Sequence, residues 1–107
     1  MSTKKYGVKE LEKDFGHLTF GKILVAHRQG EGLSQVKLAK FLGISKQSLN
    51  DLESERRIPS INRAIKIAKK ISILPELAVE LVLQAQVNQE KLKLKVSVTT
   101  TKSNQAT

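Results

Sequence analysis

The sequence predicts an all-α fold of five helices, from its composition, the spacing of its apolar residues and the turn residues between apolar segments. Hydrophobic residues make up 39% of the 107-residue chain but aromatic residues only 4%. The core must therefore consist mainly of Leu, Ile, Val and Ala, which pack well between helices. A chain of this length is typical of one compact domain with one core.

Five segments carry apolar residues at helical spacing, the first of them over residues 18–29. Four of these segments have, at or just before their start, a side chain that can cap the first turn of a helix: Thr19, Ser34, Ser45 and Ser60. Gly43 is the expected left-handed stop between the two short helices that follow Ser34 and Ser45. The fourth segment has an apolar stripe of Ile61, Ala64, Ile65, Ala68 and Ile71.

The fifth segment opens at Pro75, a residue suited to the first turn of a helix. It is more apolar than a single core face requires, which indicates a contact between two copies of the chain. We expect an N-terminal extension over residues 1–17, a domain with a dimerisation helix over 18–90, a strand over 91–98 and a disordered tail over 99–107.

The strand is predicted from a strict two-residue alternation of Lys or Ser with Leu or Val between Lys91 and Val98. A single strand needs a partner, which is either the same strand of a second copy or another protein. The alternative is that this segment continues the fifth helix or forms a frayed tail.

The net charge of +9 predicts a polyanionic partner, nucleic acid or acidic membrane, unless the basic residues merely form solvated helix faces. Residues 20–70 hold eleven basic and four acidic residues, so most of the excess lies in the helical region. The chain has no cysteine, no signal-peptide pattern and no apolar run of the ~18 residues that span a bilayer. We therefore expect a cytoplasmic protein without a membrane segment, a metal site or a cofactor.

The most specific pattern lies between Leu33 and Glu53, LSQVKLAKFLGISKQSLNDLE. It resembles the helix-turn-helix of the Xre family, which includes Cro and lambda repressor, with the pattern L-S-Q-x-x-L-A-x-x-x-G-I-S-x-x-x-L-x-x-L-E. The resemblance covers about residues 18–72 and continues into an R-x-P-S loop at Arg57. It implies a five-helix lambda-repressor-like domain in a homodimeric repressor that reads pseudo-palindromic double-stranded DNA.

The outward side of the helix after Ser45 carries short or amide-bearing polar side chains at its N-terminus, where such domains meet base edges in the major groove. The residues expected to read bases are Lys46, Gln47, Ser48, Asn50 and Asp51. Those expected to bind phosphates are Ser34, Gln35, Ser45, Arg56, Arg57 and Ser60. In related repressors the positions of Arg28 and Glu53 form a buried ion pair, and the residues expected at a dimer contact are Leu77, Leu81, Leu92, Leu94 and Val96.

One position departs from the family pattern, because Ser54 and Glu55 stand where a glycine usually follows the second helix of the motif. A non-glycine residue costs about 1 kcal/mol in the left-handed conformation, so we expect the loop to take a different path. That expectation puts a contact between Arg56 and DNA in doubt.

Two other classes of function are alternatives to a DNA-binding repressor. An antitoxin would use the same domain, autoregulate its operon and bind a toxin protein through its C-terminal region. A nucleotide-using enzyme is suggested by Gly16-x-x-x-x-Gly21-Lys22, but Ile23 replaces the Ser or Thr that would hold magnesium and no apolar strand precedes the motif. His17 and His27 have no third ligand nearby, and no nucleophile–base–acid set is present, so we do not expect an enzyme.

Overall fold

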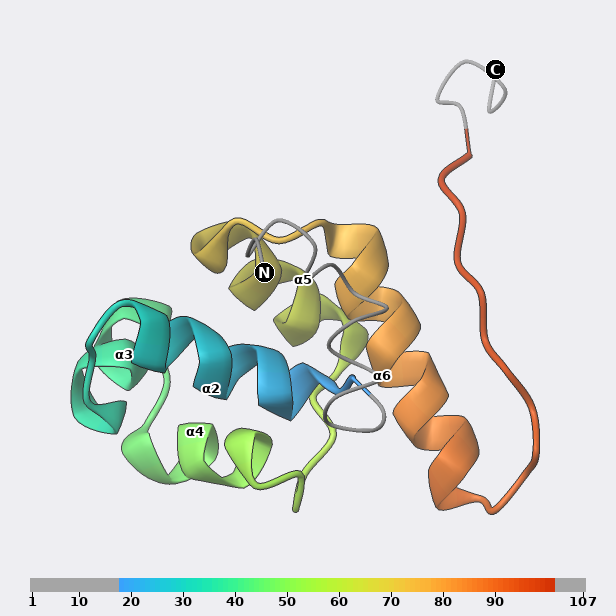
Figure 1. Ribbon diagram of the computed structural model, residues 1–107, viewed down its shortest axis with the longest axis horizontal. Coiled ribbons are helices and arrows are strands. Elements are labelled where there is room, and N and C mark those ends of the chain that lie inside the picture. Colours follow the sequence, from blue (N-terminus) through green and yellow to red (C-terminus); the bar gives the residue numbers. More distant parts are fainter. Residues whose placement is uncertain (1–17, 102–107) are drawn as a thin grey trace, which may run out of the picture. The chain divides into compact units, whose positions relative to one another are not determined.

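The computed structural model describes residues 18–101, and these form five helices (Figure 1). The chain divides after Arg57 into two compact units, whose described parts we call unit 1, residues 18–57, and unit 2, residues 58–101. The predicted N-terminal extension and residues 102–107 of the predicted tail lie outside the described residues. The all-helical fold is confirmed, whereas residues 18–101 contain no strand and the strand over 91–98 is not confirmed.

Unit 1 contains α2 (Phe20–Gly30), α3 (Gln35–Leu42) and α4 (Lys46–Glu53), and both α2 and α3 pack against α4. The predicted caps are present, because the hydroxyl oxygens of Thr19, Ser34 and Ser45 each accept a hydrogen bond from the backbone N–H three residues later. A cap of this kind stabilises a helix by about 1 kcal/mol. Gly43 ends α3 with a φ of 74°, the left-handed stop that the sequence predicts.

The core of unit 1 consists of aliphatic side chains and one phenylalanine. Leu24, Leu38 and Leu49 have no exposed surface, and Leu52 and Phe20 are nearly as deeply buried. Full burial of such a side chain contributes roughly 1.5–3 kcal/mol. These contacts fix the orientation of α4, and so determine which of its side chains face outward.

Unit 2 contains α5 (Ile61–Ile71) and α6 (Pro75–Gln89), which pack against each other. Ser60 caps α5 and Pro75 occupies the first turn of α6, both as predicted. The buried stripe of α5 is Ala64, Ile67, Ala68 and Ile71. The predicted stripe was therefore wrong in part: Ile61 is 40% exposed and Ile65 half-buried, and Ile67 is a core residue in their place.

Helix α6 ends at Gln89, so residues 91–98 do not continue this helix. The backbone N–H groups of Lys91 and Leu92 donate to the carbonyls of Asn88 and Val87, at 2.9 and 3.3 Å, and Lys91 has a φ of 60°. This is a Schellman turn, which satisfies the last carbonyls of the helix and redirects the chain. Residues 92–101, which we call the arm, then run as an extended segment beside α6 (Figure 1).

Candidate functional site

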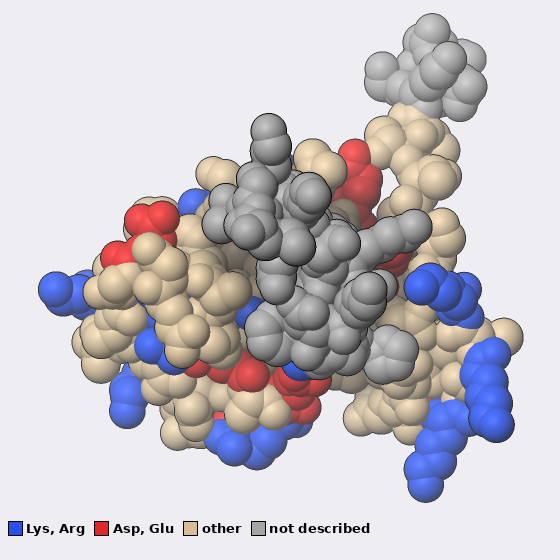
Figure 2. All heavy atoms as spheres, in the orientation of Figure 1, with Lys and Arg blue, Asp and Glu red and all other residues tan. Residues whose placement is uncertain are grey.

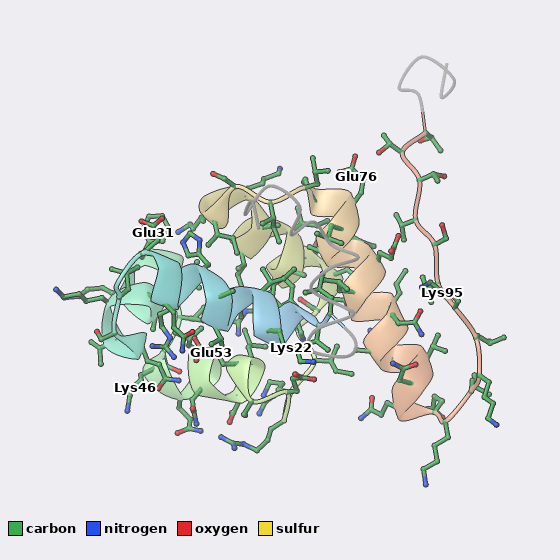
Figure 3. The ribbon with its side chains drawn as sticks, viewed as in Figure 1. Lys22, Glu31, Lys46, Glu53, Glu76 and Lys95 are labelled. Atoms are coloured by element: carbon green, nitrogen blue, oxygen red, sulfur yellow. The ribbon has the colours of Figure 1, made fainter. Side chains whose placement is uncertain are left out.

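The outward face of α4 carries the side chains predicted to read bases. Lys46 and Gln47 are exposed, whereas Ser48, Asn50 and Asp51 are half-buried. Lys46 points away from unit 1 at the start of the helix (Figure 3). The buried Leu49 and Leu52 hold the opposite face of α4 in the core, so these polar side chains share one side of the helix.

The start of α4 has a compact pair of hydroxyl groups. The Ser45 Oγ accepts a hydrogen bond from the backbone N–H of Ser48, at 2.9 Å, and donates to the Ser48 Oγ, at 3.0 Å. Both serines are therefore oriented before any ligand is present. The positive end of the helix dipole lies at the same place, and it favours an anion there.

Three polar side chains surround the carboxylate of Asp51. Its Oδ1 accepts from the Gln47 Nε2 at 3.0 Å and from the Arg56 Nε and Nη2 at 3.2 and 3.1 Å, and its Oδ2 lies 4.0 Å from the Arg57 Nε. The side chain of Asp51 is 18% exposed, and those of Arg56 and Arg57 are 58% and 68% exposed. The cluster thus presents two guanidinium groups to solvent, and Figure 2 shows basic and acidic atoms side by side on this part of the surface.

A second network ties α2, α3 and α4 together beneath this face. Arg28 of α2 donates to the two carboxylate oxygens of Glu53, at 2.8 Å from Nε and 3.2 Å from Nη2, so the Glu53 side chain extends from the end of α4 toward α2 (Figure 3). The Gln35 Nε2 donates to the Glu53 Oε1 at 2.9 Å and to the Asn50 Oδ1 at 3.2 Å. The Glu53 side chain is only 5% exposed, so its charge depends on these donors.

This network changes the interpretation of two predicted site residues. Gln35 was expected to hold a phosphate, but in the unbound protein both bonds of its amide nitrogen are directed inward, toward Asn50 and Glu53. Asn50 accepts through its Oδ1, so its amide nitrogen is left to donate outward. The sequence pattern alone did not indicate this link, because Gln35 and Asn50 belong to different helices.

The loop after α4 keeps the path that a glycine would take, which corrects our expectation of a different one. Glu55 has a φ of 66°, and the N–H groups of Glu55 and Arg56 donate to the carbonyls of Leu52 and Asp51 in a Schellman turn. The Thr19 hydroxyl also donates to the Glu55 Oε2 at 2.9 Å. The loop therefore brings Arg56 to Asp51 although its left-handed residue is not glycine.

Gly21 is a structural residue, although its place in the sequence suggested only part of a nucleotide-binding pattern. It lies inside α2, and a β-carbon at this position would lie 2.6 Å from the Leu52 carbonyl oxygen and 2.9 Å from that of Glu53. The missing side chain lets α2 approach the backbone of α4 closely. The available signal was a glycine near the start of the apolar segment 18–29, at a place where alanine would favour the helix more.

Unit 2 holds the remaining predicted residues. Ser60 caps α5 through the backbone N–H of Arg63, at 3.1 Å, and its side chain is exposed. Of the predicted dimer residues, Leu92 and Leu94 are 51% and 59% exposed. Leu77 and Val96 are half-buried, but Leu81 is 9% exposed and belongs to the core, so we remove it from the predicted contact.

Polar side chains of α6, four residues apart, hold the arm. Gln84 donates to the Leu94 carbonyl at 2.9 Å and accepts from the Val96 N–H at 2.7 Å. Glu80 accepts from the Val98 N–H at 3.0 Å. All three contacts use the backbone of the arm, so the predicted strand segment is bound to a helix face in a single chain.

Glu76 completes this row near the start of α6 (Figure 3). Its carboxylate accepts a hydrogen bond from the Thr100 hydroxyl. This bond, together with one from the backbone N–H of Glu76 itself, lowers the pKa of the carboxyl group below its ordinary value of 4.5. The ionised form of Glu76 is therefore the form that holds the arm.

The comparisons with known proteins give one match. Residues 24–76 match the model of a protein family described as helix-turn-helix. There is no significant match among curated proteins and none among solved structures. Within residues 18–101, no three His, Cys, Asp or Glu side chains are grouped so that they could hold a metal, and no helix is long and apolar enough to cross a membrane.

Proposed function

Through residues 24–76 this chain belongs to the Xre and lambda-repressor-like helix-turn-helix family of DNA-binding transcriptional regulators, and we propose that it is a dimeric, sequence-specific repressor. The observation that carries the proposal is the outward face of α4. Its exposed Lys46 and Gln47 lie in the first turn of a helix whose other face is fixed in the core, and Asn50 lies about one turn further along. A helix presented in this way fits the major groove.

The groups proposed to hold the DNA backbone surround this face in unit 1. Arg56 and Arg57 are mostly exposed and positively charged, and the N-termini of α3 and α4 at Ser34 and Ser45 offer positive dipole ends. Ser60, at the start of α5, is a further proposed phosphate contact. Such contacts fix the position of a protein on DNA but carry no sequence information.

The proposal is tested by selecting a preferred duplex from randomised DNA and measuring its affinity at several salt concentrations. We expect a pseudo-palindromic site whose half-sites lie about one helical turn, roughly 34 Å, apart. Affinity should fall steeply between about 50 and 200 mM salt. Selection that yields no preferred sequence, or an affinity unaffected by salt, would overturn the proposal.

Two substitutions distinguish a residue that reads bases from a residue that binds the phosphate backbone. Gln47→Ala should reduce discrimination at one base pair by about 1–3 kcal/mol, because a bidentate amide contact is lost. Arg57→Ala should weaken binding to all duplexes equally and reduce the salt slope by about one unit. Equal losses for Gln47→Ala on the selected and on random DNA would contradict its role as a base-reading residue.

For the dimer, we propose that the arm pairs with the arm of a second copy. Alternate backbone groups of the arm face α6, and no described residue forms a hydrogen bond with the backbone of Lys95, Ser97 or Thr99 on the other edge. An extended segment with one free edge can add a strand. An antiparallel pair centred near Ser97 would place lysines opposite hydroxyl residues, which avoids like charges across the pair.

Truncation after Gln89 tests the dimer. The truncated protein should dissociate at higher concentration in sedimentation experiments and bind the selected duplex more weakly, while its helical circular dichroism persists. An antitoxin is the second candidate function, because the exposed Leu92 and Leu94 beside a free backbone edge could equally bind a toxin protein. A truncated protein that dimerises and binds DNA normally would contradict the arm pairing and favour the antitoxin.

A further inference from the structure

We propose that Asp51 reads no base itself but acts as a positioning residue, which orients the Gln47 amide so that it selects adenine over guanine. This inference rests on the proposed function. Its geometric basis is the bond from the Gln47 Nε2 to the Asp51 Oδ1, at 3.0 Å. The two residues lie four positions apart on α4, where side chains on a helix surface meet.

The chemistry of the two groups fixes the orientation of the amide. An ionised carboxylate only accepts hydrogen bonds, so it can face the amide nitrogen of Gln47 but not its carbonyl oxygen. The Gln47 carbonyl oxygen accepts no hydrogen bond from any described residue and belongs to an exposed side chain. Gln47 therefore presents an acceptor, together with the second N–H of its amide group.

This arrangement matches one purine better than the other. Adenine offers an amine donor at N6 and an acceptor at N7, which pair with the Gln47 carbonyl oxygen and its remaining N–H. Guanine offers two acceptors, O6 and N7, and would face the Gln47 oxygen with another oxygen. Without Asp51 the amide can rotate by half a turn and present its donors to guanine.

The surroundings of Asp51 argue against direct base contact by its carboxylate. Its Oδ1 already accepts from Gln47 and twice from Arg56, and the Arg57 guanidinium is near its Oδ2. Its side chain is only 18% exposed, whereas that of Arg56 is 58% exposed. The carboxylate thus accepts hydrogen bonds from neighbouring side chains, and two cations balance its charge.

The test measures how strongly each variant prefers adenine over guanine at the base pair that Gln47→Ala identifies. Asp51→Asn is the main variant, because it keeps the size of the side chain but allows either end of the Gln47 amide to face it. We expect this preference to fall on the order of 5- to 100-fold, the value of one bidentate contact. Asp51→Glu keeps an acceptor-only group within reach and should retain most of the preference.

Two controls separate positioning from charge and from phosphate binding. Glu31→Gln removes the same charge from an exposed residue of unit 1 and should leave the preference unchanged. Arg56→Ala should weaken all duplexes alike without altering it. The double variant Gln47→Ala with Asp51→Asn should prefer adenine over guanine no less than Gln47→Ala alone does, because the two changes remove the same interaction.

Three results would overturn the inference. In the first, Asp51→Asn keeps the full preference for adenine. In the second, it alters preference at a different base pair from Gln47→Ala, which would make Asp51 a base-reading residue. In the third, Glu31→Gln relaxes the preference as much as Asp51→Asn does. If the parent protein bound DNA without any sequence preference, both the proposed function and this inference would be overturned.

Discussion

Substitution of Gly21 by alanine tests whether α2 and α4 approach each other as closely as the structure shows. A β-carbon there would lie 2.6 Å from the Leu52 carbonyl oxygen, 2.9 Å from that of Glu53 and 3.0 Å from the Glu55 Cγ. Two of these neighbours are backbone atoms at the end of α4, so no side-chain rotation can relieve the contact. The helices must separate by several tenths of an ångström.

The expected effect is a balance of two opposing terms. Alanine is favoured over glycine inside a helix by about 0.8–1.0 kcal/mol, whereas an extra methyl group in a packed core costs about 1–3 kcal/mol. Because the clash is with backbone, we take the upper half of that range. Gly21→Ala should therefore lower the free energy of unfolding by about 1–2 kcal/mol, or the melting temperature by roughly 4–12 °C.

Gly30 offers a matched control at the end of the same helix. A β-carbon at Gly30 would meet no atom within 4 Å. Gly30→Ala should then be neutral or stabilise the protein by up to about 1 kcal/mol. Urea unfolding followed by circular dichroism measures both variants under the same conditions. If Gly21→Ala proved as stable as Gly30→Ala, the close approach of the two helices would be refuted.

Three further predictions concern the other contacts. Arg28→Ala should lower the free energy of unfolding by about 3–5 kcal/mol in urea titrations, because it leaves the buried Glu53 carboxylate without its cation; an unchanged value would show that solvent reaches Glu53. Glu55→Gly should be more stable than Glu55→Ala by about 1 kcal/mol, since both lose the bond to Thr19 and only glycine relieves the left-handed strain; equal stability would contradict a strained Glu55. The pKa of the Glu76 carboxyl group is lowered in the folded protein, so its contact with Thr100 is complete above pH 4.5 and should be lost as the pH falls through the lowered pKa. Nuclear magnetic resonance signals of the arm should follow that transition in the parent protein but not in the Glu76→Gln variant.

Local signals in the sequence predicted the local structure well. The caps at Ser34, Ser45 and Ser60 and the left-handed stop at Gly43 were predicted because each depends on a few neighbouring residues. The same holds for the outward face of α4, which follows from the positions of two leucines. These features predicted two short helices joined by a glycine turn, and the resemblance of residues 33–53 to the Xre motif identified the pair as a helix-turn-helix.

Contacts between distant residues were harder to predict. The bonds from Gln35 to Asn50 and Glu53 and the close approach at Gly21 join different helices, and the sequence of either helix alone does not reveal them. The loop at Glu55 was predicted wrongly because local strain was weighed without the packing that stabilises it. Alternation in the arm predicted its extended backbone but not that α6 side chains would bind it.

The contacting residues of the arm and of α6 are spaced slightly differently along the two segments. Four residues of an α-helix rise about 6.0 Å, whereas two residues of an extended chain advance about 6.6 Å. The contacts at Gln84, Glu80 and Glu76 therefore match those at Val96, Val98 and Thr100 with a mismatch that grows by about 0.6 Å at each step. After a few steps the mismatch exceeds what a hydrogen bond tolerates, so the geometry limits how far an extended chain can follow the helix. Inserting one residue before Val96 would instead direct the other backbone edge toward α6 and exchange the two faces of the arm.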